Sequence, residues 1–199
     1  MIARRWWVMV FAVAACCGVL FAQEPEGAAK RRPNVLLLLA DDLRADVLST
    51  FGGHDFPTPN LDALAARGAA LSRVYCMGSR HGAVCAPSRA MLMSGRMLTR
   101  VTDQLTDALD EQHAAVRTLP EQLREAGYAT FATGKWHNGD ESLRRAFPDA
   151  RAVFRGGMCD HFQVPLCDVV GGEVKNERTG ARHSSELFAD AAIDFLRRH

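Results

Sequence analysis

The fold is indicated most clearly by residues 33–42, which read PNVLLLLADD. Residues 35–40 are an uninterrupted apolar run of about strand length. A short run without polar alternation is typical of a strand covered on both faces, as in a parallel α/β sheet. Asp41 and Asp42 end the run, and open α/β sheets place their ligands at the carboxyl ends of strands. The stretch therefore predicts a buried strand that carries functional carboxylates.

The rest of the chain alternates between helical and strand-like patterns. Apolar spacing and helix-terminal residues predict helices near residues 58–68, 88–93, 119–126 and 184–198, and apolar runs predict strands at 69–76 and 128–133. Residues 138–182 show no clear periodicity, so we expect a long surface excursion there. This alternation is the rhythm of an α/β fold.

The N-terminus resembles a secretory signal. Arg4 and Arg5 precede an apolar run of about 17 residues, 6–22, and a polar stretch follows. We expect cleavage near Ala22 and export to the periplasm or outside the cell, with no stable membrane span. Two alternatives are a retained membrane anchor and a lipoprotein with its lipid on Cys16. Residues 23–32 are then a short linker.

The chain's charge gives no indication of a nucleic-acid or acidic-lipid partner. It has 199 residues, 24 of them Lys or Arg and 23 Asp or Glu, which leaves a formal charge of +1. This balance gives no field for binding nucleic acid or acidic lipid by charge alone. Any functional cation must therefore be an individually placed one.

Four of the six cysteines lie beyond residue 22, and an even number in an exported protein suggests disulfides. Cys159 and Cys167 enclose a short loop and form a believable pair; with His161 they could also suggest zinc, but the spacing matches no standard zinc site. Cys76 and Cys85 could form another pair.

Residues 85–96, CAPSRAMLMSGR, are the most informative segment. They match the pattern C-x-P-S-R followed by Ser-Gly-Arg, and on these residues the chain resembles the type I, formylglycine-dependent sulfatases. The resemblance implies an alkaline-phosphatase-like α/β fold, with a mixed, mainly parallel sheet flanked by helices. It also implies that a formylglycine-generating or anaerobic sulfatase-maturating enzyme oxidises Cys85 to formylglycine, whose hydrate attacks sulfur. Cys85 would then take no part in a disulfide.

The carboxylates Asp41 and Asp42 have several possible roles. From chemistry alone they could be a general acid/base pair, a site for a hard cation, or a helix cap with a solvated neighbour. Beside the motif at Cys85, they resemble the metal-binding aspartates of sulfatases. The resemblance implies that they bind Ca²⁺ together with the oxygen of the modified Cys85. Since calcium takes several oxygen ligands, more must come from elsewhere.

Residues 134–139, GKWHNG, resemble the sulfatase element G-K-W-H-x-G. The resemblance implies that Lys135 binds a sulfate oxygen and that His137 hydrogen-bonds the hydroxyl that loses its proton when sulfate departs. Arg89 adds a planar fork of donors suited to oxyanions. Asn138 departs from the family pattern, where Leu is more usual, and we expect it to alter packing rather than chemistry.

Other side chains are weaker candidates. Arg80 and His81 lie just before Cys85 and could face the substrate, whereas a lone loop histidine is usually just solvated. The remaining histidines considered for a pocket are His54, His161 and His183.

The resemblance covers residues 33–199, which we expect to be the N-terminal part of a sulfatase catalytic domain whose C-terminal remainder is missing. The expected activity is hydrolysis of a sulfate ester, of a small molecule or a carbohydrate. Two alternatives are a phosphoester or phosphonate hydrolase of the same superfamily and a truncated, non-catalytic remnant.

Overall fold

The computed structural model describes residues 32–79, 84–101 and 116–199. The described residues divide into two units, one that ends at Ala40 and one that runs from Asp41 to His199. The signal segment, Cys16, Arg80 and His81 lie outside the described residues. No helix in the described ranges is long and apolar enough to cross a membrane.

In the first unit, the expected strand at residues 35–40 is not formed. Residues 32–40 are extended without strand pairing. The side chains of Val35–Leu39 are 47–69% exposed. An apolar strand of this kind needs sheet neighbours on both sides, and the described part of this unit supplies none.

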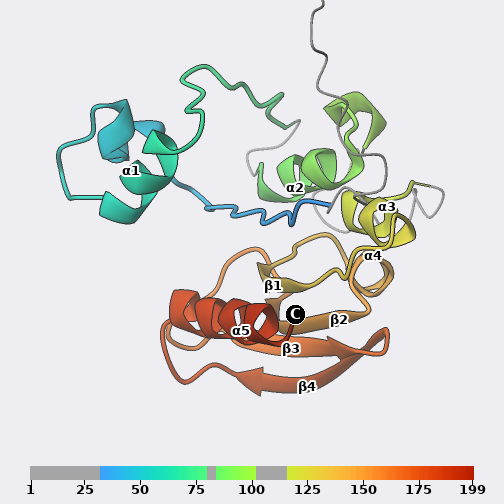
Figure 1. Cartoon of the computed structure of the whole chain (residues 1–199). Coiled ribbons are helices and arrows are strands. Elements are labelled where there is room, and N and C mark those ends of the chain that lie inside the picture. The colour runs from blue at the N-terminus through green and yellow to red at the C-terminus, as the bar shows by residue number, and fades with distance from the viewer. Residues whose placement is uncertain (1–31, 80–83, 102–115) are drawn as a thin grey trace, which may run out of the picture. The chain divides into compact units, whose positions relative to one another are not determined.

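The second unit contains a four-stranded sheet in the order β1-β2-β3-β4 (Figure 1). The strands are β1 (Ala132–Lys135), β2 (Asp149–Phe154), β3 (Pro165–Val170) and β4 (Glu173–Thr179). β1 and β2 are parallel, whereas the other two pairings are antiparallel. The α/β class and the mixed sheet are confirmed, but the described sheet is not mainly parallel.

The described residues of this unit also form five α-helices: α1 (Pro59–Ala66), α2 (Cys85–Ser94), α3 (Leu119–Glu125), α4 (Asp140–Ala146) and α5 (Ser184–Arg198). Short 3-10 turns lie at η1 (Ala45–Val47), η2 (Ser49–Phe51) and η3 (Leu98–Arg100). The predicted helices near α1, α2, α3 and α5 are confirmed. The predicted strand at 69–76 is wrong, because those residues are exposed and form no strand in the structure.

Two apolar clusters hold the sheet. One joins α4 and α2 to the strands through Leu143, Ala90 and Val153, all at most 1% exposed. The other places Leu187 and Phe188 of α5 against β2 and β3, and Figure 1 shows α5 lying across the sheet. Helices therefore pack on the sheet through two separate clusters, as an amphipathic helix and a two-faced sheet require.

The surface excursion expected at residues 138–182 is wrong. These residues form α4, β2, β3 and β4, and they contribute much of the core. The alternation was hidden by bulges, where the pairing register shifts between Ala150 and Val153 and between Leu166 and Asp168. A bulge breaks the period of two on which strand prediction depends.

Asp168 holds both irregular strands in place. Its buried carboxylate accepts hydrogen bonds from the backbone N–H of Ala152 at 2.9 Å and from Arg178 and Asn176 at 3.0 Å each. Ala152 and Asn176 both have left-handed backbones, with φ of 48° and 55°. Such residues need support from their surroundings, and Asp168 bonds to both of them.

Candidate functional site

The candidate site begins with helix α2, whose first residue is Cys85. Proline lacks a backbone N–H, and the N–H groups of the first helical turn have no partner within the helix, so Pro87 costs the helix no hydrogen bond there. Arg89 lies one turn after Cys85, so the two side chains share a helix face. The Cys85 thiol is free and partly buried. Neither expected disulfide is formed, since Cys76, Cys159 and Cys167 are also free thiols.

Strand β1 brings a second basic residue to Arg89. The Arg89 guanidinium donates a hydrogen bond from Nη1 to the carbonyl oxygen of Lys135 at 2.5 Å. The side chains of Arg89 and Lys135 are only 11% and 12% exposed. Two cations with so little solvent interact strongly with an anion between them.

Asp41 is the carboxylate that faces these cations. Lys135 Nζ donates a hydrogen bond to Asp41 Oδ2, and Arg89 Nη2 lies 3.7 Å from the same oxygen. The structure therefore brings together three sequence-predicted residues that lie far apart in the chain. Asp42 is exposed and has a left-handed backbone with φ of 56°.

The cations decide the ionisation of Asp41. Burial raises the pKa of its carboxyl group, but the hydrogen bond and charge of Lys135 lower it more, and Arg89 and His137 add to the lowering. The resulting pKa lies below its usual value, so Asp41 is an anion at neutral pH. Burial lowers the pKa of Arg89 more than the charges of Asp41 and Cys85 raise it. The guanidinium nevertheless stays protonated.

Trp136 anchors the segment that carries Lys135 and His137. Its indole Nε1 donates to the Gly139 carbonyl at 2.9 Å and to Ser142 Oγ at 3.0 Å. Its ring packs edge-on against Phe147, with ring centroids 5.7 Å apart. Asn138, the residue that departs from the sulfatase pattern, is fully buried and donates to the Trp136 carbonyl at 3.4 Å.

Gly157 covers the imidazole of His137. A Cβ atom at this glycine would lie 2.7 Å from His137 Cε1 and 2.8 Å from Nε2. His137 itself has a left-handed backbone with φ of 58°, a conformation that clusters at functional sites. Sequence reasoning missed Gly157, because no local pattern shows which distant side chain a glycine contacts.

The residues fit a calcium ion only in part. Asp41 and Asp42 offer the carboxylate oxygens that calcium prefers. No group of three or more His, Cys, Asp or Glu side chains that could hold a metal occurs in the described parts of the chain. Asp41 is moreover paired with Lys135. Two adjacent carboxylates can thus be part of a calcium site, which needs further oxygen ligands.

The remaining candidates do not join this cluster by any contact in the described residues. His161 Nδ1 lies 2.9 Å from Ser184 Oγ, and the His161 and His183 rings stack with centroids 5.5 Å apart. His183 accepts a hydrogen bond from the Ser185 N–H at the start of α5. Both histidines therefore have structural partners. His54 is exposed.

Comparison with known proteins gives a consistent result. The profile of the family described as Sulfatase matches residues 33–199. An arylsulfatase of Klebsiella aerogenes is 30% identical, over 89% of this chain and 42% of the relative. An N-acetylgalactosamine-6-sulfatase of Sus scrofa is 29% identical, over 98% of this chain and 41% of the relative. An N-acetylglucosamine-6-O-sulfatase of Bacteroides thetaiotaomicron is 31% identical, over 86% and 29% respectively. The chain spans less than half the length of these relatives.

Proposed function

Because the chain belongs to the sulfatase family, we propose that the protein hydrolyses sulfate esters at the cluster around Arg89 and Lys135. One observation carries the proposal: two nearly buried cations lie together beside the helix that begins at Cys85. A sulfate ester is an oxyanion, and preorganised cations in a water-poor site stabilise the charge that develops on such a group. Residues 33–199 would be the N-terminal part of the catalytic domain.

Arg89 and Lys135 would bind sulfate in different ways. The guanidinium of Arg89 is fixed by its bond to the Lys135 carbonyl, so its remaining N–H groups can donate to sulfate oxygens as a planar fork. The Lys135 ammonium is a compact charge. When sulfate binds, it would share its hydrogen bonds between Asp41 and a sulfate oxygen. Asp41 thereby keeps Lys135 oriented until the substrate arrives.

Cys85 would carry the nucleophile. Its partly buried, free thiol at the first position of α2 fits a residue that is to be modified, since a disulfide would block modification. As formylglycine hydrate, the group would supply one hydroxyl that loses its proton and attacks sulfur, so that the S–O bond to the alcohol breaks and the alcohol leaves with a proton. Deprotonation of the second hydroxyl would then break the C–O bond to sulfate, re-form the aldehyde and release sulfate. His137 would hold or remove a proton at this position; the close approach of Gly157 to its ring supports a fixed ring orientation.

Calcium would be bound in part by Asp41 and Asp42. When bound, it would polarise the sulfate oxygens and lower the pKa of the nucleophile. The ionised state of Asp41 supports the assignment, because carboxylates bind hard cations as anions.

We also propose how the protein is exported and matured. Residues 1–22 would be a secretory signal and residues 23–32 a linker, so that the protein is periplasmic or secreted, with a lipid on Cys16 as the alternative. A sulfatase-maturating enzyme, formylglycine-generating or anaerobic, would be its partner on the way. The substrate would be a sulfated small molecule or carbohydrate.

The test is chemical and kinetic. We expect the peptide that contains Cys85, from protein made with a maturating enzyme, to show the mass of formylglycine. The protein should also hydrolyse an aryl sulfate, and Cys85→Ala should abolish this. An unmodified thiol in active protein would contradict the mechanism. Faster turnover of an aryl phosphodiester would favour a phosphoester hydrolase, and no turnover of either ester would favour a non-catalytic remnant.

A further inference from the structure

The chain leaves two neighbouring strands beside His137. β1 and β2 are parallel, so both strands end at the same edge of the sheet. Just past β1, the N–H of Trp136 donates to the carbonyl of Phe154 at 2.8 Å. The loop that follows Phe154 then brings Gly157 against the His137 ring. The surroundings of the imidazole therefore depend on how this loop is held.

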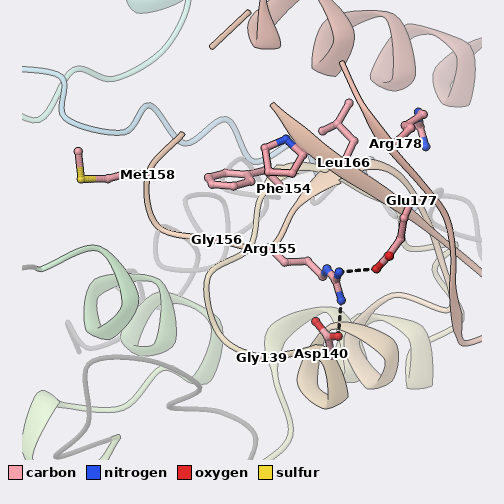
Figure 2. Close-up of a pocket in the computed structure, with 10 residues that line it drawn as sticks. Gly139, Asp140, Phe154, Arg155, Gly156, Met158, Leu166, Glu177 and Arg178 are labelled. Carbon is pink, nitrogen blue, oxygen red and sulfur yellow. Dashed lines mark hydrogen bonds and ion pairs between the residues drawn. The ribbon is translucent and has the colours of Figure 1, made fainter. Parts of the chain in front are cut away.

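Arg155, in this loop, bonds to the segment that carries His137. Its Nη1 donates to Asp140 Oδ2 at 2.5 Å, and Asp140 is the first residue of α4. Its Nη2 donates to Glu177 of β4, also at 2.5 Å. Figure 2 shows the guanidinium pointing toward both carboxylates, in the lining of a pocket of about 750 Å³. The bond to Asp140 thus joins the loop of Gly157 to the segment of His137.

Asp140 is the stronger of the two partners of Arg155. Its side chain is 43% exposed, against 66% for Glu177, and charges with less water around them interact more strongly. Burial lowers the pKa of Arg155, but the charge and the hydrogen bond of Asp140 are the largest of the effects that raise it above its usual value, and the charge of Glu177 adds less. The ion pair on the side of His137 is therefore the one that holds the guanidinium most firmly.

An ion pair of this exposure adds little to the free energy of unfolding. It can still matter for a reaction, because a misplacement of about 1 Å at a reacting group can lower the rate by about 100-fold. A loop released from Asp140 can move away from the His137 ring without unfolding the sheet, whose strands are joined by their own ladders. Measurements of stability and of catalysis therefore distinguish a structural role of Arg155 from a positioning role.

We propose that Arg155 is a positioning residue for His137. Its ion pair with Asp140 holds the loop of Gly157 against the imidazole and so keeps the ring in one orientation. The proposal rests on the proposed function in one respect: the ring held in this way is the group that would hold or remove the proton at the modified Cys85. Arg155 acts through the loop and not on the reacting atoms.

The NMR signals of the imidazole test this contact without catalysis. The protein is isotope-labelled at its histidines, and the His137 ring signals are identified by their loss in His137→Gln. We expect them to shift in Arg155→Met, which keeps most of the apolar stem but loses the donors, and in Asp140→Ala. They should stay in place in Glu177→Ala, the matched control, which removes a bond of the same length from the same guanidinium. Unmoved signals in Arg155→Met, or an equal shift in Glu177→Ala, overturn the proposal.

Kinetics then connect the contact with the reaction. For 4-nitrophenyl sulfate we expect kcat to fall about tenfold or more in Arg155→Met, with KM and the urea midpoint of unfolding unchanged. Asp140→Ala should lower kcat by as much, and the double variant by no more, because both substitutions remove the same bond. Glu177→Ala should keep the wild-type kcat.

Two kinetic outcomes overturn the proposal. A higher KM with an unchanged kcat in Arg155→Met would make Arg155 a substrate-binding residue. A lower kcat that accompanies a lower unfolding midpoint would make it a structural one. Wild-type protein that hydrolyses no sulfate ester rejects the proposed function instead, and the His137 signals still decide whether Arg155 positions the ring.

Discussion

Gly157 leaves no room for a side chain beside His137. A Cβ atom there would come within 2.7 Å of the imidazole Cε1, which is well inside van der Waals contact. The glycine does not have a positive φ, so the demand for glycine comes from the ring beside it and not from its own backbone.

Replacing Gly157 with alanine should therefore displace His137. We expect Gly157→Ala to lower kcat/KM for an aryl sulfate by about 10- to 100-fold, the size of effect that a misplacement of about 1 Å causes. The His137 imidazole signals in an NMR spectrum should shift as well. Gly68→Ala is the matched control, since its Cβ would meet only the Leu64 carbonyl oxygen at 3.5 Å. Unmoved imidazole signals in Gly157→Ala would contradict the contact.

The planar guanidinium of Arg89 predicts that lysine cannot replace it in catalysis. Arg89→Lys keeps the charge but loses the planar donors that bond the Lys135 carbonyl and face Asp41. We expect kcat/KM to fall by about 10²- to 10³-fold, as on loss of an oxyanion donor. Arg67→Lys, at an exposed bond to the Ala63 carbonyl, should have little effect. An active Arg89→Lys enzyme would show that charge alone suffices.

Asp168 predicts how stability depends on acid. Burial raises the pKa of its carboxyl group, but the hydrogen bonds of Ala152, Arg178 and Asn176 outweigh burial, so the pKa is below its usual value. The stabilisation is then complete above the unfolded pKa of about 3.9. It is lost as the pH falls through the lower folded pKa, because the unfolded state binds the proton first.

The substitution Asp168→Asn tests this contribution. We expect it to lower the free energy of unfolding at neutral pH by about 2–3 kcal/mol, from lost hydrogen bonds to a buried carboxylate. It should also flatten the fall of stability below about pH 4. Urea unfolding across acidic and neutral pH measures both. Asp149→Asn, which removes a half-exposed ion pair with Arg151, should cost at most about 1 kcal/mol. Equal losses in the two variants would contradict the role of Asp168.

The free thiols of Cys159 and Cys167 are also testable. Burial raises the pKa of both thiols, and Cys167 is only 1% exposed. The raised pKa slows alkylation at both, since the thiolate is the reactive form. We expect alkylation in the folded protein to be slower at Cys167, which is buried, than at Cys159, which is only partly buried. After unfolding without reductant both should be alkylated completely. A protected pair after unfolding would reveal a disulfide.

The sequence was most informative where a signal is local. The helix α5 follows from its apolar face, and α3 from its helix-terminal residues. The structure adds a cap to α3, since the N–H and the hydroxyl of Thr118 both donate to Glu121. The motifs also identified Asp41, Arg89 and Lys135, which the structure brings together. One local signal was overlooked: Gly171 and Gly172 both have positive φ and form the two-residue turn between β3 and β4.

The rest depends on contacts between distant residues. β4 is mostly exposed and polar, so hydrophobic patterning could not reveal it. β3 carries Asp168 in its middle, and its three hydrogen-bonding partners and the charge of Arg151 make a buried carboxylate acceptable there. Residues 35–40 show the opposite case, a strand-like pattern without the neighbours that a strand needs.

The bond between Lys135 and Asp41 joins residues 94 positions apart, and this separation bears on the order of folding. The sheet and α5 are built within residues 132–198, whereas the bond to Asp41 closes a far longer loop. Loop closure costs entropy before the contact repays it, so distant pairs form late. We therefore expect the sheet to be assembled while Asp41 is still undocked. During that interval we expect the Cys85 helix to be more accessible than in the finished protein, which would give the proposed maturating enzyme a limited time in which to act.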